Sequence, residues 1–436
     1  MMRVRDEWQE RLVKLNPYRL LGQVKRIVGL SIESQGPKAQ VGELCYIFRP
    51  DNSRIPAEVV GFKDDSVLLM PLGVADGLAP GAVVEATGQP LQVAVTDKLL
   101  GRILDGLGNV LDDGPPLVGD RFYPLMAPPP HPLSRPRIDQ VLSTGVRVID
   151  SLLTVGIGQR LGIFAGSGVG KSTLLGMIAR NSQADVNVIG LIGERGREVN
   201  EFIERDLGES GLQRSVVVVA TSDQPALVRL KGAFVATAIA EYFRDQGKNV
   251  LLMLDSVTRF AMAQREVGLA IGEPPTSRGY TPSVFALLPR LLERSGRAAQ
   301  GAITAFYTVL VDGDDMNEPI TDAVRGILDG HIVLSRELAN RGHYPAVDPL
   351  ASISRLFTEL ASKEQQEAAS TARRLLAVYR ENQDLINIGA YKVGGNPEID
   401  AAIEKLPAIN RVLQQLASEG ANYQQAVEAL MQAIRG

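Results

Sequence analysis

Cysteine and histidine are scarce in this chain, which has one cysteine, Cys45, and three histidines. A single cysteine cannot form a disulfide within the chain, so a reducing cytoplasm is the expected setting. The histidines are far apart, which excludes the close ligand spacing of a structural zinc site. There is also no apolar run of membrane-spanning length and no secretory apolar segment near residue 1. We therefore expect a soluble protein, a class that still permits peripheral contact with a membrane.

An excess of basic charge is lacking as well, because 46 Lys and Arg face 50 Asp and Glu, for a net charge of −4. Such a balance leaves no overall electrostatic footprint for nucleic acid or for an anionic membrane. With 45% hydrophobic and 22% charged residues, the 436-residue chain has the composition of an ordinary globular protein. Its length predicts two or three domains.

Residues 1–17 predict a short amphipathic helix, with Val4, Trp8, Leu12 and Leu15 at helical spacing. A helix this short is not stable alone in water, so its apolar stripe needs a partner. Two interpretations stay open: it docks on another protein or a lipid surface, or it packs on its own domain.

Residues 18–90 alternate short Val-, Ile- and Leu-rich runs with turn residues, which predicts a small β-barrel domain, with a β-sandwich as the alternative. Residues 91–145 predict an extended, irregular connector that contains 100–108 and the proline cluster 128–130. We count this connector with the domain that follows it, which runs to residue 350.

Apolar strands alternate with helices over the rest of that domain, which predicts an α/β fold with a parallel sheet covered on both faces. Residues 361–436 carry no strand pattern, and we expect a C-terminal helical domain over 351–436. The clearest helix spans 225–246, and the expected strands are Arg160–Phe164, Val186–Ile192, Ser215–Thr221, Asn249–Leu254, Ala302–Val311 and His331–Leu334.

A glycine-rich loop joins the first of these strands to a helix, which is the context of a P-loop. Its glycines allow backbone N–H groups to surround an anion, and the helix N-terminus adds partial positive charge. Ala165 stands where the first glycine is usual, but a chance turn ending in Gly-Lys-Ser is improbable in this context. The predicted nucleotide-binding residues are Gly166, Ser167, Gly168, Val169, Gly170, Lys171, Ser172 and Thr173.

Two carboxylates follow other apolar strands. Asp255 ends the run 250–254, a Walker B pattern, and would hold Mg²⁺ through water, with the Ser172 hydroxyl as a direct ligand. Glu194 follows 186–192 and can polarise an attacking water, although a solvated charged turn is the simpler interpretation without the P-loop. Arg259 can contact the γ-phosphate, support Glu194, or pair with a surface acid.

The segment between the sheet and the helical domain holds two further candidates. Tyr344 can stack on adenine, and Arg355 can serve as an arginine finger in cis or from a neighbour. The alternatives are a packed tyrosine and a surface arginine.

These residues carry a family resemblance. Residues 345–354 (PAVDPLASIS) match the signature of rotary-ATPase α/β subunits, as do Gly193-Glu194-Arg195 and the Walker pair. Within that superfamily the chain resembles the type III secretion ATPases, most of all the flagellar protein export ATPases. The stretches that carry this closer resemblance are 165–172, 214–224 (RSVVVVATSDQ), 272–275 (GEPP), 283–289 (SVFALLP) and 292–296 (LERSG).

The resemblance implies a RecA-like P-loop ATPase core, an N-terminal β-barrel and a C-terminal α-helical domain, in a homo-hexameric ring with ATP and Mg²⁺ between subunits. It implies that Arg355 acts in trans and that Tyr344 stacks on adenine. The remaining roles carried over are catalysis for Glu194 and Lys171, the Mg²⁺ site for Asp255, support for Arg195, Glu198 and Arg259, and, on a loose motif, a second aromatic for Tyr391.

The resemblance also implies partners: a stator protein on the N-terminal helix, a stalk protein in the ring, substrate–chaperone complexes, and a membrane-embedded export gate. The ring would act at the cytoplasmic face of the inner membrane, coupling hydrolysis to chaperone release, unfolding and delivery of export substrates.

Alternatives remain. One is a rotary-ATPase catalytic (β-type) subunit, and another is an injectisome secretion ATPase. A hexameric nucleic-acid translocase is disfavoured by the negative charge and by the lack of a basic, aromatic-rich stretch in 18–90, so no nucleic acid is expected. A non-catalytic ring subunit would be expected to lack Glu194 or Lys171.

Overall fold

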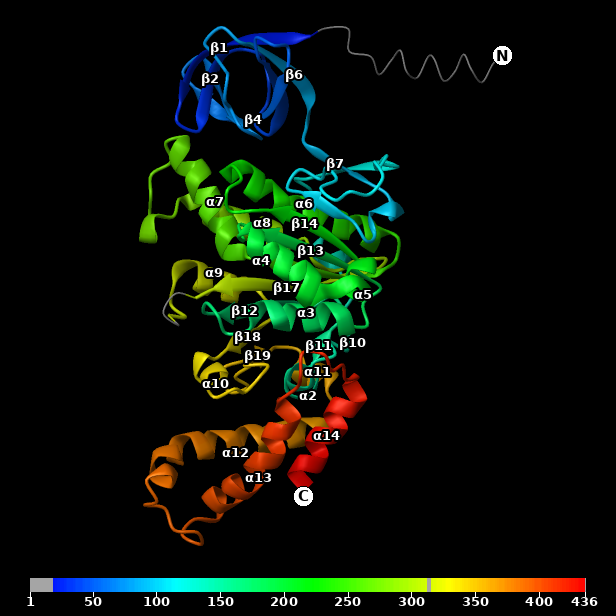
Figure 1. Ribbon diagram of the computed structural model, residues 1–436, viewed down its shortest axis with the longest axis vertical. Coiled ribbons are helices and arrows are strands. Elements are labelled where there is room, and N and C mark those ends of the chain that lie inside the picture. The colour runs from blue at the N-terminus through cyan, green and yellow to red at the C-terminus, as the bar shows by residue number, and fades with distance from the viewer. Residues whose placement is uncertain (1–18, 312–314, 436) are drawn as a thin grey trace, which may run out of the picture. The chain divides into compact units, whose positions relative to one another are not determined.

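The computed structural model describes residues 19–311 and 315–435 (Figure 1). The stripe predicted at Val4, Trp8, Leu12 and Leu15 lies outside the described residues. The chain divides into two compact units, one built around the barrel and the other around the sheet and the C-terminal helices. No helix in the described ranges combines the length and the apolarity needed to cross a membrane. The domain boundaries at residues 17, 90 and 350 stay predictions.

The first unit is a closed barrel with strand order β1-β2-β5-β4-β3-β6, which excludes the sandwich alternative. Every second residue of β3 faces the interior, so Cys45 and Ile47 are buried, and burial raises the pKa of the Cys45 thiol to about 12. Strand β2 was not predicted because it is polar; its Glu33 pairs with Arg26 at 2.5 Å. The strands are β1 (Leu20–Val28), β2 (Ser31–Gln35), β3 (Glu43–Phe48), β4 (Arg54–Lys63), β5 (Ser66–Pro71) and β6 (Val83–Pro90).

The second unit contains a nine-stranded sheet. Eight strands have the order β19-β18-β12-β17-β15-β13-β14-β8, where β8 is Ile103–Asp105, and the ninth, β16, pairs with β17 outside this order. The strands from β18 to β8 run parallel, whereas β19 and β16 are antiparallel to their neighbours. The six predicted strands are confirmed to within one residue at each end. The bounds are β12 (Arg160–Ala165), β13 (Val186–Ile192), β14 (Ser215–Ala220), β15 (Asn249–Asp255), β16 (Gly296–Arg297), β17 (Ala302–Leu310), β18 (Gly330–Leu334) and β19 (Ile353–Ser354).

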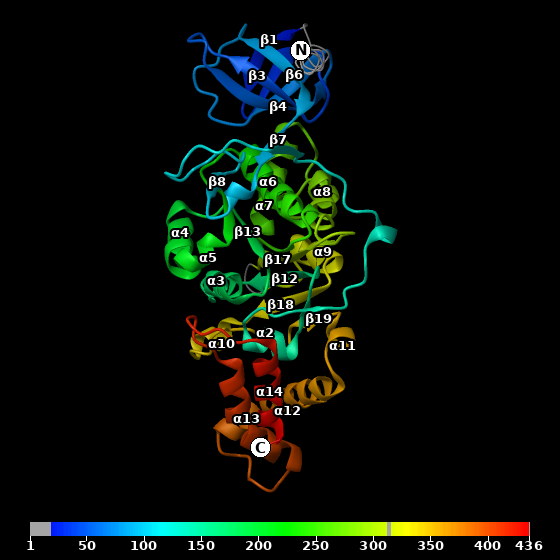
Figure 2. The ribbon, with the colours of Figure 1, turned by 90° about the vertical axis from the view of Figure 1, so that its right-hand side faces the viewer.

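Helices cover both faces of this sheet, as Figure 2 shows, with α3, α4 and α5 on one side and α8 and α9 on the other. The strands are buried almost completely, β13 at all of its positions, which explains their continuous apolar sequences. The helices are α3 (Lys171–Asn181), α4 (Gly196–Glu201), α5 (Gly208–Gln213), α6 (Ala226–Asp245), α7 (Val257–Ala270), α8 (Pro282–Leu292), α9 (Pro319–Ile327), α10 (Arg336–Asn340) and α11 (Phe357–Leu360).

The prediction of an irregular connector over 91–145 is wrong in part. Strand β8 (Ile103–Asp105) pairs with β14 and extends the sheet, and its Leu104 is fully buried. A three-residue strand carries too little periodicity to be seen in a sequence. Two more strands, β7 (Gln92–Val95) and β9 (Arg121–Pro124), pair with each other, whereas the proline cluster 128–130 is irregular as expected.

From Lys363 on, the described chain is helical, as predicted, with α12 (Lys363–Asn387), α13 (Pro397–Leu413) and α14 (Tyr423–Arg435), whereas the short strand β19 (Ile353–Ser354) lies in the part of 351–436 that was also expected to be helical. Local chemistry defines their starts, since the Asn396 side chain accepts a hydrogen bond from the N–H of Glu398 and Pro397 occupies the first turn. The helices pack on α2 (Arg147–Leu152) and share one hydrophobic core with the sheet. The helical part is therefore held against the domain that contains the sheet.

Candidate functional site

The predicted phosphate loop, residues 166–173, runs from the end of β12 into the first turn of α3, which begins at Lys171. Gly168 and Gly170 have φ values of +77° and +91°, in the left-handed region that glycine adopts without strain. Space is open around Gly168, where an added Cβ would meet no atom within 4 Å. The Ala165 methyl belongs to the buried core instead of the loop, so the departure from the usual glycine leaves the cradle unchanged.

Three charged side chains meet where parallel strands end. Lys171 Nζ lies 2.5 Å from Asp255 Oδ1, at the end of β15, and 3.6 Å from Glu194 Oε1, after β13. The Thr308 hydroxyl on β17 donates to Asp255 Oδ1 at 2.7 Å and holds that carboxylate in place. Thr308 belongs to no motif, so the sequence contained no signal for it.

Burial and mutual charge set the electrostatics of this cluster. Burial raises the pKa of Glu194, the charge of Asp255 adds to the rise, and Lys171 only partly opposes it, so the pKa reaches about 7. Burial acts to lower the pKa of Lys171, but Asp255 and Glu194 outweigh it and the pKa is raised. The lysine therefore stays charged, and Glu194 can gain or lose a proton near neutral pH.

Glu194 and Arg259 each present a polar atom that has no hydrogen-bond partner within the described chain. Glu194 Oε1 and Arg259 Nε are both buried and make no hydrogen bond. Gly193, the residue before Glu194, leaves room for Arg259, because a Cβ there would lie 2.7 Å from the Cβ of Arg259. Buried polar groups usually bind something, so this pair, beside the open phosphate loop and Lys171, fits a phosphate and a water.

Tyr344 lies beside the loop. A Cβ on Gly170 would lie 3.5 Å from its ring, and the residue is 46% exposed. A pocket of about 770 Å³ opens there, within the size range of small-molecule sites. The C-terminal helical segment supplies part of its wall, a contribution that no local pattern predicts; lining residues include Thr173, Pro345, Pro407, Arg411, Gln414 and Leu416.

Two predicted site residues, Arg195 and Tyr391, make their side-chain contacts outside this cluster. Arg195 is exposed and pairs with Glu198 at 3.4 Å. Tyr391 belongs to the loop between α12 and α13, and its hydroxyl bonds to Asp400 at 2.9 Å. Figures 1 and 2 show that this loop joins the two helices at their ends away from α3. That hydroxyl caps a helix hairpin, so the structure does not bring Tyr391 to the pocket.

Arg355 lies where the parallel strands begin, whereas the phosphate loop lies where they end. It follows β19, whose Ser354 pairs with Gly330 at the start of β18, whereas the phosphate loop follows the end of β12. Arg160 and Ala165 are five positions apart in β12, and each position adds about 3.3 Å, so roughly 16 Å separates the two ends of the strand. Arg355 therefore cannot reach the phosphate loop of its own chain.

The raised pKa of Glu194 predicts a pH-dependent stability. Below pH 4.5 this carboxyl is protonated in both the folded and the unfolded chain; between 4.5 and about 7 only the folded chain keeps the proton, so rising pH destabilises the fold. Within this window each step of one in pH removes at most about 1.4 kcal/mol from the free energy of unfolding. Glu194→Gln imitates the protonated form, so its melting temperature should gain on the wild type as pH rises from 4.5 to 7.

The matched control is Glu204→Gln, which removes one exposed carboxylate outside the cluster. Thermal unfolding of the three proteins at several pH values checks the prediction. Parallel curves for Glu194→Gln and the wild type would contradict it.

Comparison with known proteins agrees with this architecture. Residues 145–354 match the nucleotide-binding domain of the ATP synthase alpha/beta family, and residues 24–88 match the β-barrel domain of that family. Residues 361–432 match the T3SS EscN ATPase C-terminal domain. All three parts of the fold are thus covered.

Close relatives share the full length. The chain is 59% identical over 417 residues to the flagellum-specific ATP synthase of Bacillus subtilis, covering 95% of each chain. It is 51% identical over 423 residues to a type 3 secretion system ATPase of Xanthomonas euvesicatoria, covering 97% of this chain and 96% of the relative. It superposes with a TM-score of 0.88, at 48% identity, on the assembled ATPase EscN in complex with its central stalk EscO from enteropathogenic E. coli, covering 95% and 100% of the two chains.

The phosphate loop, the two carboxylates beside its lysine, and a match in all three domains lead to one conclusion: this chain is an ATPase and belongs to the flagellum-specific and type III secretion ATPases of the ATP synthase alpha/beta family.

Proposed function

We propose that this chain is the ATPase of a flagellar protein export apparatus, acting as a homo-hexameric ring with an ATP site at each subunit interface. The observation that carries the proposal is the division of the site within one chain. Lys171, Glu194 and Asp255 lie where the parallel strands of the sheet end, and Arg355 lies where these strands begin. Identical neighbours in a ring can therefore complete one another's sites.

Each residue beside the phosphate loop has a task in phosphoryl transfer to water. Lys171 binds the β- and γ-phosphates and stabilises the charge of the transition state. Glu194 orients and polarises the attacking water, a task for which a pKa of about 7 suits it. Arg259, whose Nε has no partner in the described chain, contacts the γ-phosphate, and Tyr344 stacks on the adenine.

Ser172 and Asp255 would hold Mg²⁺ with the nucleotide phosphates, the aspartate through water, and the ion would neutralise phosphate charge. The described residues include no cluster of three His, Cys, Asp or Glu side chains able to hold a metal alone. This fits Mg²⁺, which keeps several waters and arrives with phosphates instead of occupying an all-protein cage.

The ring couples hydrolysis to chaperone release, unfolding and delivery of export substrates to a gate at the inner membrane. A stalk protein in the ring is supported by the complex of the related EscN with its central stalk EscO. The flagellar assignment, over an injectisome, is supported by the 59% identity to the flagellum-specific relative. A stator protein on residues 1–17 completes the proposed partners.

The purified chain alone tests the ring. A rotary catalytic subunit would need a second kind of subunit to supply its arginine, whereas this chain should hydrolyse ATP by itself. Turnover per subunit should rise with protein concentration in step with the hexamer fraction measured by light scattering. Full turnover in a demonstrably monomeric preparation would contradict the shared site.

Deletion of the gene tests the flagellar assignment. The deletion strain should lose motility and export of filament protein, and a plasmid copy should restore both. Normal motility with loss of another secreted protein set would instead indicate an injectisome.

A further inference from the structure

The backbone that carries Arg355 is anchored, although its side chain is not. Within the described residues the Arg355 guanidinium makes no hydrogen bond or ion pair, and it is exposed. Its N–H, however, donates to the Asp329 carbonyl at 3.0 Å. The preceding residue is held too, since Gln159 Nε2 donates to Ser354 Oγ at 3.0 Å. A long side chain thus leaves from a fixed point.

Asp329 is itself clamped by Arg160, the first residue of β12. Arg160 Nε donates to Asp329 Oδ2 and Nη2 to Oδ1, both at 3.0 Å, and the Arg160 N–H adds a third bond to Oδ2 at 3.1 Å. The pair is largely out of solvent, with side chains 14% and 26% exposed. A bidentate pair in such surroundings fixes direction as well as distance.

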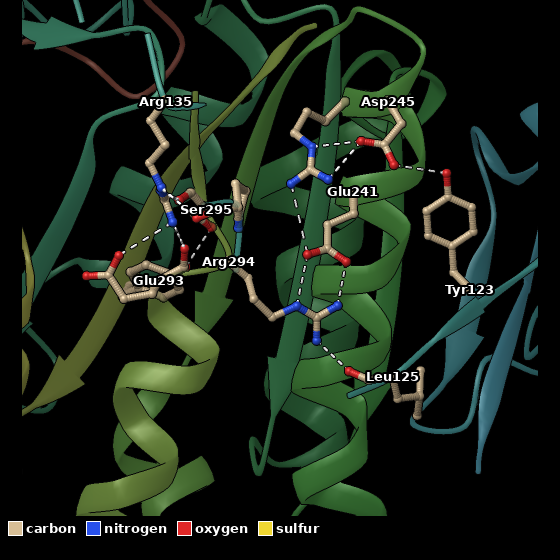
Figure 3. Close-up of polar contacts among 11 residues, drawn as sticks. Tyr123, Leu125, Arg135, Glu241, Asp245, Glu293, Arg294 and Ser295 are labelled. Atoms are coloured by element: carbon tan, nitrogen blue, oxygen red, sulfur yellow. Dashed lines mark hydrogen bonds and ion pairs between the residues drawn. The ribbon is translucent and has the colours of Figure 1, made fainter. Parts of the chain in front are cut away.

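The other side of Arg160 is braced. Its Nη1 lies 2.6 Å from Glu293 Oε1, in the segment 292–296 singled out in the sequence. Arg135 from the connector lies 3.5 Å from the same carboxylate and donates to the Glu293 and Ser295 carbonyls, as Figure 3 shows. A series of ion pairs and hydrogen bonds therefore links Arg135 in the connector to the backbone of Arg355, through Glu293, Arg160 and Asp329.

The brace is rigid because the next residue anchors it. Arg294 is fully buried and makes a bidentate pair with Glu241 on α6, and its third nitrogen donates to the Leu125 carbonyl (Figure 3). Neighbouring Arg244 pairs with Asp245 at 2.7 Å, which accepts from Tyr123. Segment 293–295 is thus bound to a core helix and to the connector.

We propose that Arg160 and Asp329, braced by Glu293, are positioning residues for Arg355, and that they present its guanidinium to the nucleotide of the neighbouring subunit. The inference rests on the proposed trans role of Arg355. Arginine reaches a phosphate productively only within a narrow range of geometry, and a displacement of about 1 Å can cost on the order of 10²-fold in rate. An exposed side chain without hydrogen bonds of its own depends on its backbone for that geometry.

The test variant is Asp329→Asn, which keeps one acceptor oxygen and the Asp329 carbonyl but removes the charge that aligns Arg160. We expect kcat for ATP in assembled rings to fall about 10- to 100-fold. The KM for ATP should change by less than about twofold, because the nucleotide-binding loop of the same chain lies at the other end of the parallel strands from Asp329. Steady-state ATPase measurement on hexamers gives both constants.

The chain offers a matched control in Arg102 and Asp112, another bidentate pair with a backbone bond to the aspartate. Arg102 lies 2.6 Å from Asp112, the side chains are 11% and 20% exposed, and the Ile103 N–H donates to the same carboxylate at 2.7 Å. The pair sits beside β8, at the other margin of the sheet from β19. Asp112→Asn should leave kcat within about twofold of the wild type.

The double variant separates positioning from stability. If Asp329 acts through Arg355, adding Asp329→Asn to Arg355→Ala should cause no further loss of kcat. A further loss equal to that of the single variant would overturn the inference, as would a single variant with wild-type kcat in intact rings. Normal kcat in Arg355→Ala would instead overturn the proposed trans function, which distinguishes the two failures.

If Asp329→Asn does not assemble, Arg160→Lys replaces it, because lysine keeps the charge but loses the fork. The same drop in kcat, with an unchanged KM, is expected in assembled rings. A wild-type kcat in Arg160→Lys rings would overturn the inference.

Discussion

Glu194→Gln is expected to lower the rate of ATP hydrolysis by about 10²–10⁴-fold while ATP binding stays close to normal. Glutamine keeps the size and one hydrogen-bonding oxygen, but it cannot accept a proton from water. Two contacts support the proposed role: Lys171 Nζ is 3.6 Å from Glu194 Oε1, and that oxygen has no hydrogen-bond partner in the described chain.

Two measurements check this result. Fluorescence titration with a nucleotide analogue should give an affinity within a few-fold of the wild type, and steady-state hydrolysis should be nearly absent. Glu204→Gln, an exposed glutamate outside the cluster, should behave as the wild type. Substantial turnover in Glu194→Gln would remove this residue from the role of water-positioning group.

Arg355→Ala is expected to lower kcat by about 10³-fold or more, the range associated with loss of an arginine finger. The reason is the loss of positive charge at the γ-phosphate as negative charge develops in the transition state. An isolated monomer cannot show this effect, because Arg355 and the phosphate loop of one chain lie at opposite ends of the parallel strands.

Mixing two inactive variants tests whether the arginine acts in trans. Lys171→Ala has a defective phosphate loop and an intact Arg355, and Arg355→Ala has the reverse. In mixed rings some interfaces pair an intact loop with an intact arginine, so part of the activity should return. Absence of any recovery, in rings shown by mass measurement to contain both variants, would argue against the trans role.

Local order along the chain was enough to predict the phosphate loop, the six central strands and the C-terminal helices. The loop depends on glycines, a lysine and a hydroxyl within a few residues, and the strands depend on apolar runs bounded by turns. Asp255 and Glu194 were predictable for a related reason. Each follows a parallel strand, and the carboxyl ends of such strands meet at one edge of the sheet.

Contacts between distant residues could not be predicted in this way. Thr308 holds Asp255 from 53 residues away, and Arg160 holds Asp329 from 169 residues away. Neither pair has a local pattern, because the order of strands in the sheet decides which residues become neighbours. The hairpin position of Tyr391 was missed for the same reason, whereas strand β8 was missed because three residues carry too little periodicity.

The separation of Arg355 from Lys171 is the clearest case. The sequence identified both residues, but not that they lie at opposite ends of the parallel strands. That separation follows from β19 running antiparallel to β18, a pairing that local spacing does not encode. Hydrogen bonding between strands far apart in the chain is established only as the sheet assembles. It is that assembly which leaves the arginine out of reach of its own phosphate loop.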